Sequence, residues 1–329
     1  MPESADGLII ATCGGFTVCI IHVDQEKTVM RYTNPEDSFF CSLAWSKPLR
    51  TTLSENYKTT YSLSAEGYCM LAAGTTNGAI HLLLPSCLLC VDLLQRHSQV
   101  VTALQFHPKH KTLLLSGSAD KTCIVWSISL LTSDKQATNT VALKIIQVGD
   151  EIASLCFTDD FFVILGKGGF AVQYSADPKN FSRQPSSNPL TCFRNHFILV
   201  DCVRGLPQNQ ISCIVTKKKS STVHHLKVVD LSSSKVLKRF YFYGDAHEYS
   251  SFFVNDDILV LGDEKGILYL YSLQEALLRT VKPFQTLKHS DKRLTYAIRD
   301  VVINATSDTI VAVNSNNMVM VWRAVKALT

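Results

Sequence analysis

Short apolar runs separated by polar turns recur along this chain of 329 residues. The clearest runs span residues 100–106, 112–116 and 122–127. Proline, lysine and aspartate occupy the turns between them, at 107–109 and 119–121, and residues of these types favour chain reversal. Apolar runs of this length with such boundaries predict antiparallel strands rather than helices.

The same rhythm of apolar run and polar or glycine turn recurs before and after this segment. Counted by the middle run of each set, there are about seven sets. The runs, in order, are residues 8–13, 16–23 and 28–32; 39–45, 68–73 and 79–84; the three runs above; 152–157, 161–165 and 170–174; 197–203, 210–215 and 223–231; 249–254, 257–261 and 267–271; and 296–303, 309–313 and 318–322.

The segment HSQVVTALQFHPKHKTLLLSGSADKTCIVWSI resembles one WD repeat, the unit from which β-propellers are built. In that resemblance His97, a hydroxyl from Ser116 or Ser118, Asp120 and Trp126 form the hydrogen-bonded set that braces one blade. Buried donors and acceptors need partners, so we assign this set a structural role rather than a catalytic one.

The fold class predicted is therefore all-β, a WD-repeat β-propeller of about seven blades. All-β repeat folds run long as one domain, so we expect residues 1–329 to form a single propeller domain. Only residues 1–6 precede the first run. We therefore expect the first blade to lack its N-terminal strand, and the chain to be the C-terminal part of a longer protein.

Composition favours a packed globular protein without catalytic machinery. Hydrophobic residues make up 46% and charged residues 18%, and the chain lacks the apolar run of about 18 residues that a membrane span needs. Cys87 and Cys90 have the spacing of a metal-binding pair, but no second pair stands near enough in the sequence to complete a zinc site. We expect no metal, no cofactor and no enzymatic activity.

Charge gives a weaker indication of partners. The net charge is +4, and the one tight basic cluster is Lys217, Lys218 and Lys219. Its place between two predicted strands makes a solvated hairpin tip the simpler interpretation. The alternative is a contact with nucleic-acid phosphates that is blind to sequence and weakens with salt.

Five segments, ATCGGFTVCIIHVDQ, EDSFFCSLAW, the repeat quoted above, LVLGDEKGILYLYSL and TIVAVNSNNMVMVW, are similar to the WD-repeat domain of leucine-rich repeat and WD repeat-containing proteins, which associate with the origin recognition complex. A more distant similarity is to the propeller subunit of the Polycomb methyltransferase complex. Both resemblances imply a nuclear, chromatin-associated protein that reads methylated histone tails and has no catalytic activity. The closer resemblance also implies that it helps to recruit or stabilise the origin recognition complex on heterochromatin.

The Polycomb resemblance also implies where a methyl-lysine cage would lie. Aromatic rings at the starts of inner strands would hold the methylated cation, which places Phe39 or Phe40 and Tyr249 in the cage. Tyr296 opens the last set of runs and is a further candidate from strand position. Glu248 stands where the relative has an aromatic residue, which favours lower methylation states or the absence of a cage. The second hypothesis is an interaction platform without a cage of its own.

Overall fold

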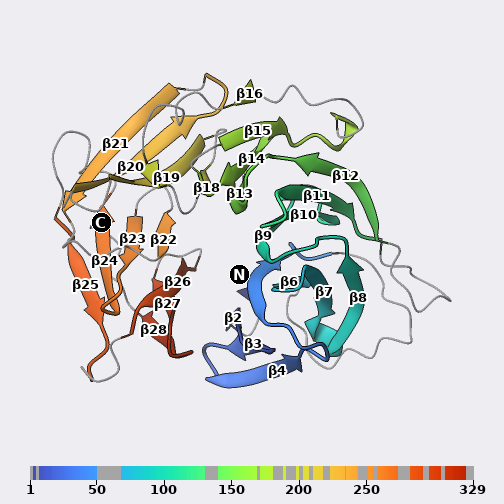
Figure 1. The fold of residues 1–329 in the computed structure, drawn as a ribbon. Helices are drawn as coiled ribbons and strands as arrows, with labels where there is room; N and C mark the ends of the chain where they lie inside the picture. The colour runs from blue at the N-terminus through green and yellow to red at the C-terminus, as the bar shows by residue number, and fades with distance from the viewer. Residues whose placement is uncertain are drawn as a thin grey trace. The chain divides into compact units, whose positions relative to one another are not determined.

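Strands dominate the computed structural model. It describes residues 3–4, 7–49, 68–129, 140–168, 171–180, 188–189, 198–199, 203–206, 210–217, 223–233, 235–243, 251–254, 258–272, 282–291, 296–304 and 308–323. The chain divides into two compact units, Met1–Pro189 and Leu190–Thr329, which we describe separately (Figure 1).

The first unit holds four antiparallel sheets, each built from strands that follow one another in the chain. The first sheet contains β1 (Glu3–Ser4), β2 (Gly7–Gly14), β3 (Thr17–His22) and β4 (Lys27–Thr33); the second β5 (Phe40–Trp45), β6 (Leu71–Thr75), β7 (Ala79–Leu84) and β8 (Leu89–Gln95); the third β9 (Val101–Phe106), β10 (Leu113–Ser118), β11 (Thr122–Ser127) and β12 (Val141–Gln147); and the fourth β13 (Ile152–Phe157), β14 (Phe161–Gly166), β15 (Ala171–Ser175) and β16 (Asn188–Pro189). Two 3₁₀ turns, η1 (Pro85–Cys87) and η2 (Pro178–Asn180), follow β7 and β15.

The second unit holds three more antiparallel sheets. Their strands are β17 (Ile198–Leu199), β18 (Val203–Leu206), β19 (Gln210–Lys217), β20 (Val223–Asp230) and β21 (Lys235–Tyr243); β22 (Ser251–Val254), β23 (Ile258–Gly262), β24 (Ile267–Ser272) and β25 (Gln285–Lys288); and β26 (Ile298–Ile303), β27 (Thr309–Asn314) and β28 (Val319–Arg323). Both β17 and β18 pair with β19. The succession of small antiparallel sheets confirms the predicted all-β fold class.

Among the described residues, the first sheet has a very short edge strand and the last sheet has fewer strands than the others. In the first sheet β1 has two residues, Glu3 and Ser4, which pair with the start of β2. The last sheet has three strands in the part of the chain that the structure describes. The middle strands differ from the edges in being buried along their whole length, as in β6, β7 and β10.

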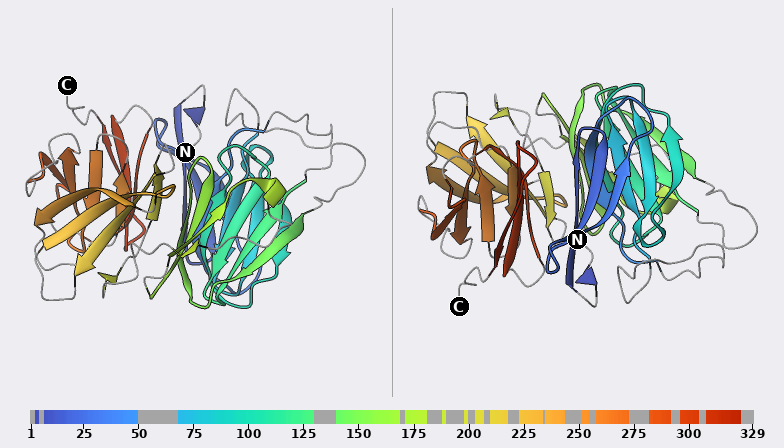
Figure 2. Two further views of the ribbon diagram at one scale, coloured as in Figure 1. Left: turned by 90° about the horizontal axis from the view of Figure 1, so that it is seen from above. Right: turned by 90° about the horizontal axis from the view of Figure 1, so that it is seen from below.

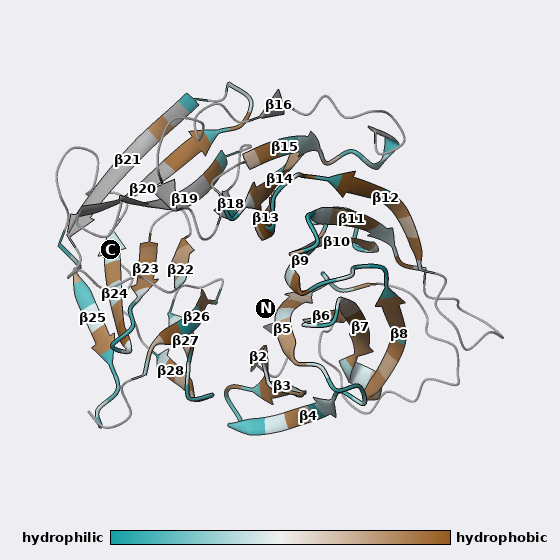
Figure 3. Ribbon diagram, in the orientation of Figure 1, coloured by the Kyte–Doolittle hydropathy of each residue, from teal (hydrophilic) through white to brown (hydrophobic). Residues whose placement is uncertain are grey.

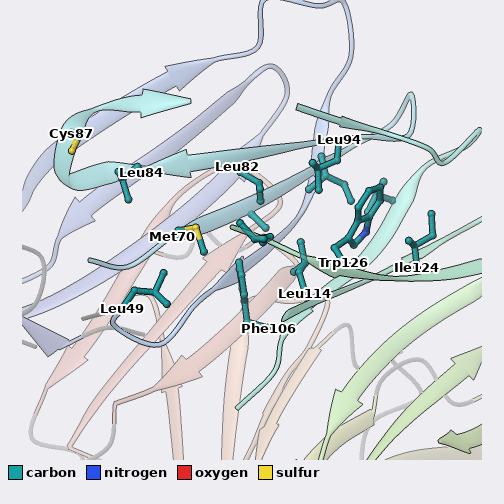
Figure 4. Close-up of a cluster of buried hydrophobic side chains, with 14 residues drawn as sticks. Leu49, Met70, Leu82, Leu84, Cys87, Leu94, Phe106, Leu114, Ile124 and Trp126 are labelled. Atoms are coloured by element: carbon teal, nitrogen blue, oxygen red, sulfur yellow. The ribbon is translucent and has the colours of Figure 1, made fainter. Parts of the chain in front are cut away.

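The hydrophobic cores of the first unit lie between neighbouring sheets, which face one another in the views of Figure 2. One core joins the first two sheets, one joins the second and third, and one joins the third and fourth. Figure 4 shows the middle core, where Met70, beside the second sheet, packs with Phe106, Leu114 and Trp126 of the third. Because both faces of a middle strand enter such a core, its sequence is a continuous apolar run rather than an alternating one.

Candidate functional site

Two phenylalanine rings lie exposed side by side in the first unit. Phe39, directly before β5, is 51% exposed, and Phe16, in the turn between β2 and β3, is 38% exposed. Their ring centroids are 4.6 Å apart and the ring planes are inclined by 59°. Burying one such side chain is worth about 1.5–3 kcal/mol, so an exposed aromatic pair marks a surface suited to binding.

Hydrogen bonds between three turns hold this pair in place. The backbone N–H of Phe40 donates to the carbonyl of Gly15 at 2.8 Å, and that of Asn34 donates to the carbonyl of Phe16 at 2.7 Å. The N–H of Phe39 donates to the Thr76 hydroxyl at 3.1 Å, while the Thr76 N–H donates to the Phe39 carbonyl at 2.9 Å. The turns β2–β3 and β6–β7 and the loop before β5 therefore form one braced surface, here called the aromatic corner.

A carboxylate lies in the loop that forms part of the aromatic corner. The Asn34 side chain accepts a hydrogen bond from the Glu36 N–H at 3.0 Å and donates to the Ser38 carbonyl at 2.9 Å. The Glu36 carboxylate accepts hydrogen bonds from the side-chain amides of Asn77, at 2.9 Å, and Gln95, at 3.3 Å. Both the loop backbone and the carboxylate are thus held in one arrangement.

The structure separates the two alternatives at the start of β5. Phe40 is only 4% exposed and packs edge-on against His81, with ring centroids 5.2 Å apart, and beside Tyr32. Burial raises the pKa of the Tyr32 phenol, and its hydroxyl lies 3.0 Å from His81 Nδ1. Phe40 is therefore part of the core between the first two sheets, and Phe39 is the ring that a ligand can reach.

The other predicted cage residues belong to the second unit. Tyr296 precedes β26 and is 37% exposed. Tyr249 and Glu248 lie outside the described residues. Sequence reasoning did not select Phe16 or Glu36; the signal available for Phe16 was a large aromatic residue in a glycine turn, where a polar residue is more common.

The predicted bracing residues of the third sheet come together in a continuous chain of hydrogen bonds. Trp126 Nε1 donates to Ser116 Oγ at 2.8 Å, and Ser116 Oγ lies 2.8 Å from His97 Nε2. His97 Nδ1 lies 3.0 Å from Asp120 Oδ2. Ser118 lies beside the chain, accepting the Asp120 N–H at 3.1 Å and donating to the Gln99 carbonyl at 3.1 Å.

The protonation states of this network follow from its donors. The indole N–H can only donate, so the Ser116 hydroxyl proton is available for His97 Nε2, and Nδ1 carries the ring proton toward Asp120. Burial lowers the pKa of His97 despite the nearby carboxylate. Burial alone would raise the pKa of Asp120, but hydrogen bonds from Thr122 and Ser98, together with His97, lower it overall. Each polar side chain of the network thus has a hydrogen-bond partner within the protein.

The remaining predicted features give little chemistry. Lys217 ends β19, whereas Lys218 and Lys219 lie outside the described residues. Cys87 is a buried free thiol and Cys90 an exposed one, and the described residues contain no group of three side chains suited to a metal ion. In the part of the chain that the structure describes, no helix is long and apolar enough to cross a membrane.

Known proteins share this sequence pattern. Residues 3–184 match the family described as leucine-rich repeat and WD repeat-containing protein 1, WD domain. Proteins named leucine-rich repeat and WD repeat-containing protein 1 are similar to the chain: the one from Xenopus laevis is 25% identical over 95% of this chain and 47% of its own length, and the one from Mus musculus is 29% identical over 49% and 24%.

The relative of that name from Homo sapiens is 30% identical over 40% of this chain and 19% of its own length. The chain thus spans less than half the length of these relatives. None of them bears on the similarity to the Polycomb propeller subunit, which stays a prediction. Since the family match covers more than half of the chain and the fold is a succession of WD-type sheets, the chain belongs to the family of the WD domain of leucine-rich repeat and WD repeat-containing protein 1.

Proposed function

We propose that this domain is a non-catalytic scaffold of nuclear chromatin, which binds methylated lysine in histone tails at the aromatic corner and so helps to recruit the origin recognition complex. One observation carries the proposal: the partly exposed rings of Phe39 and Phe16 lie side by side on a braced surface. A trimethylated ammonium has no N–H to donate, so aromatic faces and the loss of water around its methyl groups provide most of its binding energy.

Preorganisation of the corner supports this choice of ligand. The backbone on both sides of Phe39 is tied to Thr76, so the ring loses little freedom when a ligand covers it. Tyr249, Tyr296 and Glu248 remain sequence-based candidates for further contacts.

The test is a titration of the whole chain with histone-tail peptides that differ only in methylation of one lysine. We expect Phe39→Ala to weaken binding of the methylated peptide by about 1–2 kcal/mol, the scale of a cation–π contact that loses water, and to leave the unmodified peptide unaffected. Phe39→Tyr keeps the ring face and should retain most of the affinity.

Val321→Ala on β28 is the matched control, because it removes an exposed apolar side chain in another sheet. Equal losses for methylated and unmodified peptides in Phe39→Ala would contradict methyl-lysine reading.

One observation favours the second candidate function, an interaction platform without a cage. The outer strand β12 exposes Val141, Leu143 and Ile145 to 48%, 47% and 47%, and it is hydrophobic along much of its length (Figure 3). Exposed apolar edge strands are usually covered by a partner. If Leu143→Asp abolishes binding of the origin recognition complex while Phe39→Ala leaves it intact, the platform accounts for recruitment.

A further inference from the structure

The Glu36 carboxylate is held in place but its charge is not neutralised. Its two hydrogen-bond partners, the amides of Asn77 and Gln95, are neutral. None of the ion pairs found among the described residues includes Glu36. A carboxylate has about four lone-pair sites. Two of them are used here, so the group can accept further hydrogen bonds from a cation.

Comparison with the third sheet shows that Glu36 does not reach inward as its counterpart His97 does. Glu36 precedes Phe40 by the same four residues by which His97 precedes Val101, and these two strand starts pair with equivalent residues, Thr75 and Ser118. His97 reaches inward to a buried hydroxyl. Glu36 instead stays at the partly exposed surface, where its carboxylate accepts hydrogen bonds from Asn77 in the neighbouring turn and from Gln95 at the end of β8.

The position of Glu36 relative to the aromatic corner limits what can bind there. Asn77, which holds the carboxylate, directly follows Thr76, which holds the backbone of Phe39. Three residues of extended chain span at most about 10 Å, so the Cα atoms of Glu36 and Phe39 lie within that distance of each other. An extended peptide covers the same distance in about three residues.

We infer that Glu36 is a specificity-determining residue, which binds an unmodified lysine or arginine side chain placed within about three residues of the side chain that covers Phe39 and Phe16. This inference rests on the proposed peptide binding at the aromatic corner and names a second requirement of the same peptide. Lysine and arginine keep their N–H donors and can bond to a carboxylate, which a trimethylated lysine cannot do.

The experiment measures the dissociation constants of the whole chain for paired peptides. Each pair carries the same methylated lysine and differs at one position within three residues of it: arginine against citrulline, or lysine against norleucine. For the wild-type chain we expect that replacing the charged residue that contacts Glu36 by its neutral counterpart weakens binding about threefold to fivefold, as for one partly exposed ion pair. The difference should be smaller at high salt. Glu36→Gln should bind both members of the pair alike.

Glu26→Gln is the control, because Glu26 is an exposed acid in the turn between β3 and β4, at the other end of the strands from Phe16. It should keep the full preference of the wild-type chain, and equal melting temperatures of the variants show that each is folded. If Glu36→Gln keeps the preference while Phe39→Ala loses methyl discrimination, the inference is wrong and the proposed function stands. If Phe39→Ala retains methyl discrimination, or no peptide binds, both are wrong.

Discussion

The second and third sheets share one backbone plan but use polar residues in opposite ways. In both sheets the first strand shifts register by one residue after its start, at Phe40 in β5 and Val101 in β9. In the third sheet a buried chain of hydrogen bonds runs from Trp126 through Ser116 and His97 to Asp120. Every polar group in that chain has a protein partner, so the sheet is braced from within.

The second sheet has apolar residues at the inner positions of that chain. Ala73 and Leu83, both fully buried, stand where the third sheet has its serine and its tryptophan. The outer positions keep a polar pair, Glu36 and Asn77, joined at 2.9 Å. The fully buried Thr75 still bonds to Asn77 and to the Ala79 carbonyl, but the second sheet lacks the longer inward chain of the third sheet and keeps its acid at the partly exposed surface. The same register thus holds an internal bracing network in one sheet and, in the other, the surface that we propose for recognition.

The largest effect is expected from removing the central hydroxyl of the third sheet. Ser116→Ala leaves the indole N–H of Trp126 and Nε2 of His97 without a partner in a buried site, and each orphaned group costs about 1–3 kcal/mol. We expect a loss of about 2–4 kcal/mol in the free energy of unfolding, measured by denaturant titration. The reciprocal Ala73→Ser buries a new hydroxyl and should also destabilise, by about 1–3 kcal/mol. A loss confined to peptide binding would contradict the structural role.

The turn after the second strand of each sheet differs in the room that it leaves for a side chain. A Cβ on Gly78, whose φ is +94°, would overlap the carbonyl oxygen of His97. Lys121 occupies the equivalent position in the third sheet with φ 69°. Gly78→Ala should therefore cost about 2 kcal/mol or more, whereas Lys121→Gly should change stability by no more than about 1 kcal/mol. Melting temperatures of the two variants test the difference, and equal losses would show that the close approach is unimportant.

Lowering the pH should reduce the free energy of unfolding, because two histidines of the third sheet are buried. Burial lowers the pKa values of His97 and His107 below the ordinary value of 6.5. In His107, Nδ1 accepts the N–H groups of Lys109 and His110, so a proton there would face two donors. A folded-state pKa below the unfolded one means that the unfolded chain takes up protons first. The free energy of unfolding should be constant above about pH 6.5 and fall as the pH decreases below it, in denaturant titrations at successive pH values. A pH-independent stability from neutral pH to pH 5 would contradict this.

The smallest effect is expected where the two sheets exchange their turn residues. Asn77→Asp puts a second carboxylate against Glu36 and replaces a 2.9 Å hydrogen bond by repulsion, which should cost about 0.5–1 kcal/mol and diminish with salt. Asp120→Asn removes a charge that accepts hydrogen bonds from Ser98 and Thr122, and should cost more, about 1.5–3 kcal/mol. Denaturant titration at low and high salt measures both. An Asn77→Asp loss that is indifferent to salt would argue against a fixed Glu36.

The first three strands of the third sheet could be predicted closely because they are apolar runs bounded by turn residues. The run at residues 122–127 coincides with β11, and the run at 100–106 differs from β9 by one residue. Outer strands were harder. The third sheet was predicted without its outer strand, yet β12 pairs with β11. The sequence of β12 is apolar, but a mostly polar stretch of sequence, residues 132–140, separates it from β11.

The aromatic corner could be predicted only in part. Alternation along a strand places Phe39 and Phe40 on opposite faces, but the sequence does not say which face meets the neighbouring sheet. The register shift at Cys41, between Phe40 and Ser42, belongs to the pairing with β6 and cannot be read from β5 alone. Phe16 and Glu36 were missed because each acquires its neighbours from another turn, distant in the sequence.

By itself the sequence determined the succession of sheets, the strand type and the members of the third sheet's network, because apolar periodicity, turn residues and a WD repeat are local signals. Only the tertiary structure decided that Phe40 is buried, that Phe39 is exposed against Phe16, and that the Glu36 carboxylate is fixed by Asn77 and Gln95. The physical reason is that exposure and charge pairing depend on which turns the folded sheets bring together, and those turns are separated by tens of residues in the chain.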